Sequence, residues 1–275
     1  DYQQAIEFQE KALKIALELG ERVNEGNAYN WIGAAYLGLG KFLEAERAFF
    51  KAITVRESIR ETLQEDVNKV SLFDAQVQSY SGLQQALVNQ DKIDAALEVA
   101  ERGRAQAFID LLEERLPIQQ VDQLSVGKPP NLNQIQQIAE IHQSVLVVYS
   151  LIEVGPGSPS LYIWVVQPTG KTIFEIFSLE DSGIFLGDLL QQNRETIGVR
   201  GRGGFIPASN IVNETEQLRQ LHQLLIEPIA EYLPDDPDQR IIFIPQGELF
   251  LVPFPALINV NGDYLIENHT ISTSP

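Results

Sequence analysis

The sequence of 275 residues contains no cysteine, no methionine and only three histidines. The lack of cysteine excludes disulfides, thiolate metal ligands and a cysteine nucleophile within these residues. No two of the histidines, His142, His222 and His269, have the spacing of metal ligands, so we expect no metal and no other cofactor. The lack of methionine, even at the first position, indicates either a fragment of a longer protein or methionines that were recorded as another residue.

Basic residues are also few. There are 20 Lys and Arg residues against 38 Asp and Glu residues, which gives a net charge of −18. Residues 1–116 and 117–275 are both acidic, and an acidic chain repels a phosphate backbone, so we expect no nucleic-acid partner. No apolar run reaches the roughly 18 residues of a membrane helix, and the first residues do not read as a signal peptide. We therefore expect a cytoplasmic protein without a membrane partner.

The first 116 residues contain no proline, and alanine, leucine, glutamate and lysine recur in them at helical spacing. An internal repeat is visible at an offset of 40 residues. Tyr2, Ala5, Gln9 and Ala12 correspond to Phe42, Ala45, Phe49 and Ala52. Internal periods of about 20–50 residues are typical of solenoids. We therefore predict an α-solenoid of antiparallel helix pairs over residues 1–116.

The clearest repeat begins at Gly26. Its pattern consists of Tyr29, Ile32, Gly33, Tyr36, Gly40, Phe42, Ala45, Phe49 and Ala52. This order resembles the tetratricopeptide repeat, in which W-x₂-L-G-x₂-Y is followed by A-x₃-F, with Tyr29 in the tryptophan position. Small residues such as Gly33 let two helices approach closely. A third copy of the repeat matches the pattern less well, because Gln84 stands in the glycine position. The first copy lacks its opening helix, so we expect the natural protein to extend N-terminally.

The resemblance also implies a ligand-binding face on the first helix of this repeat. In related repeats the concave face holds a peptide, often through an asparagine amide, which carries both a donor and an acceptor for an extended backbone. Asn27, Asn30, Ala34 and Leu37 lie one turn apart on this helix, away from the residues that pack the repeat. We predict that these four residues bind a protein or peptide partner. The alternative is a helix face that is merely solvated.

The pattern changes after residues 117–133, which contain three prolines and few apolar side chains and which we expect to be a linker. Continuous β-branched runs then predict strands, and helical stretches alternate with them. Strands are predicted at 145–151, 161–166, 172–177 and 240–244, and helices at 135–142, at 179–193 and from the N-cap Asn213 onward. This alternation favours a mostly parallel sheet, so we assign 134–275 to an α/β domain.

The segment 241–257 carries a second resemblance. It reads IIFIPQGELFLVPFPAL and resembles the central signature of CHAT domains, which are relatives of caspases and separase and commonly follow tetratricopeptide arrays. Together with the upstream strands, the resemblance covers residues 98–275. It implies a bacterial protein in which a peptide-recognising solenoid is fused to a caspase-like α/β domain, of which this chain holds the first half.

The physical role of the signature is structural, because 241–244 is expected to form a core strand with Leu249, Val252 and Phe254 packed beneath it. In the family, the reactive histidine and cysteine lie on later strand ends, and we expect them beyond Pro275. Cysteine-peptidase chemistry is therefore implied only for the full-length parent, and whether that parent is an active enzyme stays open. The alternative is a non-enzymatic adaptor whose CHAT-like domain has lost its dyad or merely docks partners.

The three histidines are expected to be structural. His142 lies at the end of a short amphipathic helix, and His222 borders an apolar helix stripe, which indicates a position at the helix rim or surface. His269 falls in a strand predicted over 265–271. Thr270 follows it where the family motif has a glycine, so we assign no catalytic role to His269.

Overall fold

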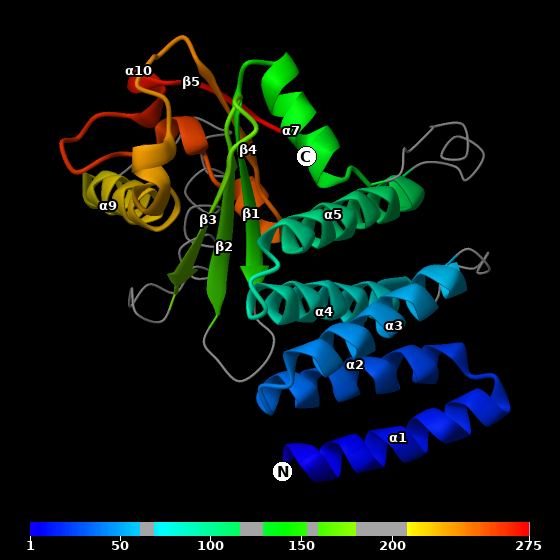
Figure 1. The fold of residues 1–275 in the computed structure, drawn as a ribbon. Coiled ribbons are helices and arrows are strands. Elements are labelled where there is room, and N and C mark those ends of the chain that lie inside the picture. The colour runs from blue at the N-terminus through cyan, green and yellow to red at the C-terminus, as the bar shows by residue number, and fades with distance from the viewer. Residues whose placement is uncertain (61–68, 116–128, 153–158, 180–207, 275) are drawn as a thin grey trace. The chain divides into compact units, whose positions relative to one another are not determined.

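The computed structural model describes residues 1–60, 69–115, 129–152, 159–179 and 208–274 (Figure 1). The chain divides into two compact units. The first contains Asp1–Leu132, and the second contains Asn133–Leu151 and Ser158–Pro275. Residues 117–128 of the expected linker lie outside the described residues, so the three-part division at 116 and 133 stays a prediction.

Five helices form the described part of the first unit. They are α1 (Tyr2–Leu19), α2 (Arg22–Gly38), α3 (Phe42–Arg60), α4 (Lys69–Val88) and α5 (Ile93–Arg115). Each helix packs on the next one along the chain, so α1 to α5 stack in order (Figure 1). Gly20, with φ 71°, ends α1, and Gly40, with φ 68°, follows the end of α2; this left-handed conformation suits glycine. The predicted helical repeats are confirmed.

One phenylalanine ring fills the space between three of these helices. Phe49 of α3 is fully buried and lies between Gly33 of α2 and Gly82 of α4. A Cβ added at Gly33 would lie 2.9 Å from Cδ1 of Phe49, and one added at Gly82 would lie 2.5 Å from its Cε1. Both distances are shorter than real Cβ contacts, so the ring fits only because both positions are glycine. The close approach predicted for Gly33 is confirmed, and Gly82 adds a second one.

The second unit is built on a five-stranded sheet. Its elements are α7 (Leu132–Ile141), β1 (Val145–Ile152), β2 (Ser160–Val166), β3 (Thr172–Ser178), α9 (Ala208–Leu225), β4 (Arg240–Ile244), α10 (Leu265–Asn268) and β5 (Thr270–Thr273). The strand order is β3-β2-β1-β4-β5. Strands β2 and β3 pair antiparallel, whereas β4 is parallel to both β1 and β5. The α/β class is confirmed, and four of the five predicted strands correspond to β1 to β4.

The central strand β1 is buried along its length, as its β-branched run predicts. On one face of the sheet, Tyr149 of β1, Phe243 of β4 and Phe254 stack together, with 4.3 Å between the ring centroids of the two phenylalanines. The hydroxyl of Tyr149 donates a hydrogen bond to the carbonyl of Leu225 at 2.8 Å. Burial raises the pKa of Tyr149 well above its usual value, so the hydroxyl stays a donor.

The segment after β4 follows the course expected from its sequence. It turns through 3₁₀ helices at Gly247–Leu251 and Phe254–Ala256. Leu249 and Val252 are buried together with Phe254 in the core that the sheet shares with α9. The signature therefore supplies apolar side chains to this core, as predicted.

Helix α9 differs from its prediction. It begins at Ala208 rather than after Asn213. A residue with a good N-cap preference marks a favourable start, but it does not stop a helix that already runs through it, because extending a helix costs much less than nucleating one. The predicted helix at 179–193 lies outside the described residues from 180 onward.

The strand predicted over 265–271 is also wrong in its first part. Leu265–Asn268 forms the short helix α10, and β5 begins only at Thr270. The backbone amide of Tyr264 donates to Oε2 of Glu267 at 3.0 Å, and this contact closes a capping box. Alternating polar and apolar residues indicate a strand, but the capping box turns this segment into a helical turn.

Candidate functional site

The four residues predicted to bind a peptide lie on α2, and two of them take part in a polar network within the helical unit. Asn27 is half-buried, and its Oδ1 accepts a hydrogen bond from Nη2 of Arg56 at 3.1 Å. Asn30 is buried, and its Oδ1 accepts from Oγ of Ser79 at 2.7 Å. Arg56 also donates to Ser79. The network therefore joins α2, α3 and α4.

The burial of this network bears on the four predicted binding residues, Asn27, Asn30, Ala34 and Leu37, which are named here the α2 face. Arg56 is itself buried, and this burial lowers the pKa of its guanidinium to about 10. Leu37 is buried like Asn30, whereas Ala34 is half-buried. The expectation that all four residues lie away from the helix packing is wrong for Asn30 and Leu37, because both side chains are buried and Asn30 contacts Ser79 of α4. Peptide binding by this face stays a prediction.

The most exposed large apolar side chain of α2 is Trp31, which the repeat pattern does not mark. Trp31 is 56% exposed and lies four positions after Asn27 and three before Ala34, so the three share one side of the helix. The other tryptophan, Trp164 of β2, is fully buried. A rare aromatic residue outside the packing pattern is the sequence signal that points to Trp31.

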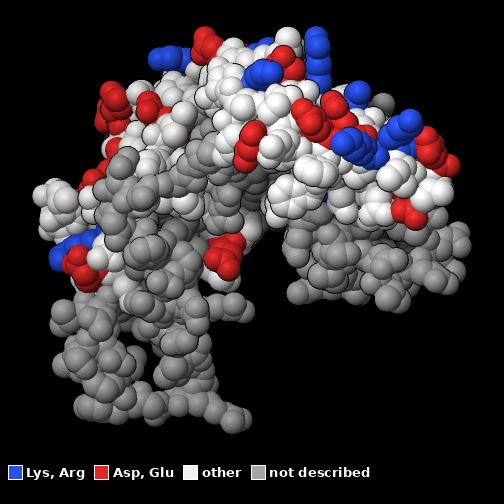
Figure 2. All heavy atoms as spheres, turned by 90° about the horizontal axis from the view of Figure 1, so that it is seen from below, with Lys and Arg blue, Asp and Glu red and all other residues white. Residues whose placement is uncertain are grey.

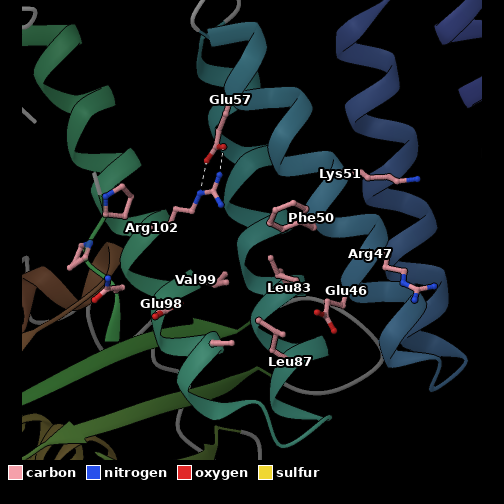
Figure 3. A pocket seen from close by; sticks show the side chains of 14 residues that line it. Glu46, Arg47, Phe50, Lys51, Glu57, Leu83, Leu87, Glu98, Val99 and Arg102 are labelled. Atoms are coloured by element: carbon pink, nitrogen blue, oxygen red, sulfur yellow. Dashed lines mark hydrogen bonds and ion pairs between the residues drawn. The ribbon is translucent and has the colours of Figure 1, made fainter. Parts of the chain in front are cut away.

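A second candidate is a groove of about 1110 Å³ between α3, α4 and α5, named here the α3–α5 groove (Figure 3). Leu83 and Leu87 of α4 supply apolar side chains to it. Phe50 of α3, 52% exposed, and Val99 of α5 flank them. Residues 129–131 line the same groove. Its volume lies close to the upper end of the roughly 300–1,000 Å³ range of small-ligand sites.

An ion pair joins α3 to α5 along the α3–α5 groove. Nε of Arg102 donates to Oε1 of Glu57 at 2.9 Å, and Nη2 donates to Oε2 (Figure 3). The hydroxyl of Tyr80 donates to the same carboxylate at 2.7 Å. Burial lowers the pKa of Arg102, but the hydrogen bond and charge of Glu57 outweigh it and raise the pKa above its ordinary value. The pair therefore stays charged and fixes this wall of the groove.

The described residues form neither a metal cluster nor a membrane-spanning helix. Among them, no three His, Cys, Asp or Glu side chains lie in a group that could hold a metal ion. None of the helices within the described ranges is long and apolar enough to cross a membrane. On the face shown in Figure 2, the basic and acidic side chains of the described residues are interspersed.

The three histidines differ in their surroundings. His142 follows the last residue of α7, close to the helix end where it was predicted, and it is exposed. His222 of α9 is buried, so the expected rim or surface position is wrong: the helix packs more deeply than its apolar stripe indicates. Nδ1 of His222 has no hydrogen-bond partner among the described residues. His269 follows α10 instead of lying within a strand.

We expect the chain to lose stability at mildly acidic pH because of His222. Burial lowers the pKa of His222, and the charge of Glu227 opposes this only in part. An unfolded histidine has a pKa of about 6.5, so the unfolded chain binds more protons as the pH falls through that value, and stability present above it is lost. The free energy of unfolding in urea should fall from about pH 7.5 to about pH 5.5, and should fall less in His222→Gln.

The matched control for this prediction is His142→Gln, because His142 is exposed. This control should show the same fall as the unchanged chain. An equal fall in all three proteins would mean that His222 is not responsible.

Comparison with known proteins matches segments of both units. The family model of the tetratricopeptide repeat matches residues 1–58, and that of the CHAT domain matches residues 215–275. Tetratricopeptide repeat protein 28 of Mus musculus is 35% identical over 151 residues, which are 54% of this chain and 6% of that protein. The Homo sapiens protein of the same name is 35% identical over 150 residues, again 54% and 6%. The chain thus matches only 6% of the length of these curated relatives. It contains tetratricopeptide repeats followed by a CHAT domain.

Proposed function

We propose that the helical repeats bind a peptide segment of a protein partner through α2, in a cytoplasmic protein whose CHAT domain belongs to the caspase-like cysteine-peptidase class. Tetratricopeptide repeats generally mediate protein–protein interaction. The observation that carries the proposal is the 56% exposure of Trp31. Tryptophan is enriched among the interface residues whose truncation costs the most binding energy. An exposed indole on a helix whose other apolar side chains are mostly buried therefore favours a partner-binding role.

Asn27 supports peptide binding by the side of α2 that carries Trp31. It lies one turn before Trp31, and its Oδ1 accepts from Arg56. With that oxygen engaged, the amide nitrogen is the group that would donate to a peptide carbonyl. Ala34, half-buried on the other side of Trp31, leaves room for a ligand side chain. Asn30 and Leu37 would act by positioning α2.

Truncation of Trp31 should weaken peptide binding about tenfold or more. The chain is used to select ligands from a phage-displayed peptide library, and the affinity of the enriched peptides is measured by fluorescence anisotropy. Trp31→Ala should lose affinity. Phe8→Ala is the matched control, because it removes an aromatic side chain that is 69% exposed on α1. This control should bind like the unchanged chain.

A second readout follows the indole itself. In Trp164→Phe, Trp31 is the one remaining tryptophan. Its emission should shift to shorter wavelength when a peptide covers it. The proposal that the α2 face binds a peptide is wrong if no peptide is enriched, or if Trp31→Ala and Phe8→Ala bind equally well.

The peptidase part of the proposal rests on the CHAT match. The 275 residues contain no cysteine, and a thiol nucleophile needs a nearby base, so the reactive residues of such an enzyme have to come from outside this sequence. The runner-up is a non-enzymatic adaptor. The two are separated by replacing each cysteine of the full-length protein with alanine and measuring cleavage of a peptide library. Loss of cleavage in one variant supports the peptidase, and the absence of any cleavage supports the adaptor.

A further inference from the structure

Strand β3 lies at one edge of the sheet in the second unit (Figure 1). Its inner side pairs with β2 along all seven residues without a bulge, whereas no strand among the described residues pairs with its outer side. An edge strand presents a row of backbone N–H and C=O groups with which another chain can pair. The outer side of β3 is therefore a surface on which the sheet can continue.

The hydrogen bonds of the β2–β3 hairpin determine which residues of β3 face outward. The amide of Gln167 donates to the carbonyl of Lys171 at 2.9 Å, and the amide of Leu179 donates to the carbonyl of Pro159 at 3.1 Å. In an antiparallel pair, the backbone groups of every second residue point to the same neighbour. The odd positions of β3 therefore bond to β2, and the even positions between 172 and 176 point outward. The outward-pointing residues are Thr172, Phe174 and Ile176.

Strand β3 lacks the features that usually keep edge strands apart. Proteins protect such edges with lysine, proline, bulges or very short strands. The seven residues of β3 read TIFEIFS and include no lysine, proline or glycine. Ile176 is 54% exposed and the other six residues are half-buried, whereas all residues of β2 except the first are buried. An apolar strand with unprotected backbone groups thus meets solvent.

We propose that the outer side of β3 pairs antiparallel with β3 of a second copy of this chain, so that the two sheets join into one. A two-fold axis through Phe174 places it opposite Phe174 of the second copy, and places Thr172 opposite Ile176. Both pairs consist of outward-pointing residues, so each exchanges two backbone hydrogen bonds. Phe174 already packs on Tyr162 and Trp164 of β2, and the second Phe174 would extend this aromatic row.

The charges along this edge favour a second copy of the same strand. A two-fold axis through Glu175 would place two carboxylates opposite each other, but the backbone groups of Glu175 point to β2, so that register cannot form. With the axis through Phe174, Glu175 lies opposite Ile173 of the other copy, and the exposed Lys171 of that copy lies two positions further along. Such diagonal neighbours are within reach of a long side chain. The pairing is therefore self-complementary in charge as well as in hydrogen bonds.

One contact of Glu175 within the chain is compatible with this pairing. The hydroxyl of Tyr232 donates to Oε1 of Glu175 at 3.0 Å. This donor carries no charge, and a carboxylate accepts further hydrogen bonds, so Lys171 of the second copy can still bind it. The net charge of −18 makes two copies repel each other, and the paired strands are short, so the association should be weak.

A cross-link traps a weak dimer and tests its register. In Thr172→Cys/Ile176→Cys, each thiol would face the other thiol of the second copy, with about 5.5 Å between the Cα atoms, which suits a disulfide. Within one chain the two positions lie about 13 Å apart along the strand, too far for a bond. Because the sequence contains no other cysteine, oxidised glutathione should give a covalent dimer on a non-reducing gel.

The single variants Thr172→Cys and Ile176→Cys are the matched controls for the cross-link. In the proposed register, each introduced thiol faces a side chain without sulfur, so each single variant should give about tenfold less covalent dimer than the double variant. Equal cross-linking in the single and double variants, or no dimer in any of them, overturns the inference.

Ile176→Pro tests the backbone hydrogen bonds of the contact. The N–H of Ile176 points outward, so proline removes no bond between β2 and β3, and circular dichroism should show a folded chain. The same change removes a donor from the pairing of the two copies. Sedimentation velocity over a range of concentrations should show self-association that is about tenfold or more weaker than in the unchanged chain.

The matched control is Ile176→Thr, which keeps the N–H and the preference for a strand and should associate nearly like the unchanged chain. Equal association of the proline and threonine variants, or a monomer at all concentrations, overturns the inference. The contact lies in the second unit and is independent of peptide binding by α2. Failure of either proposal therefore leaves the other intact.

Discussion

Replacing Phe49 with alanine should lower the free energy of unfolding of the helical unit by about 3–5 kcal/mol. The ring is fully buried between α2 and α4, and the two positions that face it, Gly33 and Gly82, have no side chain that could move into the space. A large cavity therefore remains when the ring is removed. Urea unfolding followed by the emission of Trp31, in a Trp164→Phe background, reports the loss in this unit.

The same packing predicts that the effect of Gly82→Ala on the free energy of unfolding changes sign when the ring of Phe49 is removed. In the unchanged chain, Gly82→Ala pushes a methyl group into the ring of Phe49 and should cost about 1–3 kcal/mol. In the Phe49→Ala background it should stabilise the unit by about 1 kcal/mol, because alanine favours a helix over glycine and fills part of the cavity. Additive effects of the two substitutions would contradict the contact.

Replacing Phe254 with alanine should destabilise the second unit by about 3–5 kcal/mol. Phe254 is fully buried and stacks on Phe243 at 4.3 Å and on Tyr149 at 5.8 Å between ring centroids. The measurement is urea unfolding followed by the emission of the buried Trp164, in a Trp31→Phe background. Each unit has its own reporter here, because a chain with two units need not unfold in one step.

The matched control for this prediction is Phe250→Ala. Phe250 belongs to the same CHAT signature but is 43% exposed, so its truncation should change the free energy of unfolding by about 0.5 kcal/mol or less. If the two variants are equally stable, the aromatic stack does not hold this unit together.

Much of the fold could be predicted because its signals are local. The offset of 40 residues correctly predicted the helix pairs, and the repeat pattern that begins at Gly26 correctly predicted the close approach at Gly33. The strands β2 and β3 flank Pro168, Thr169 and Gly170, and the φ of 81° at Gly170 is the conformation that such a turn needs. A prediction of this kind needs only neighbouring residues.

The α2 face could be predicted only in part, because its burial depends on distant residues. Asn30 is polar and lies on the predicted face, so helical periodicity alone places it in water. Its partner Ser79 is 49 positions away, and Arg56 lies 23 positions before Ser79. No spacing rule joins residues on three helices. The exposure of Trp31 depends in the same way on which sides of α2 are covered.

The buried guanidinium of Arg56 also determines whether the helices can slide past one another. Interfaces made only of alanine and leucine can shift by a turn and still bury apolar surface. A shift of α4 by one turn would carry Ser79 about 5.4 Å along the helix axis. Arg56 would then lose that partner in a buried place, at a cost of about 1–3 kcal/mol. The network therefore selects one register between neighbouring repeats, and that register sets the distance from Trp31 to the next helix pair.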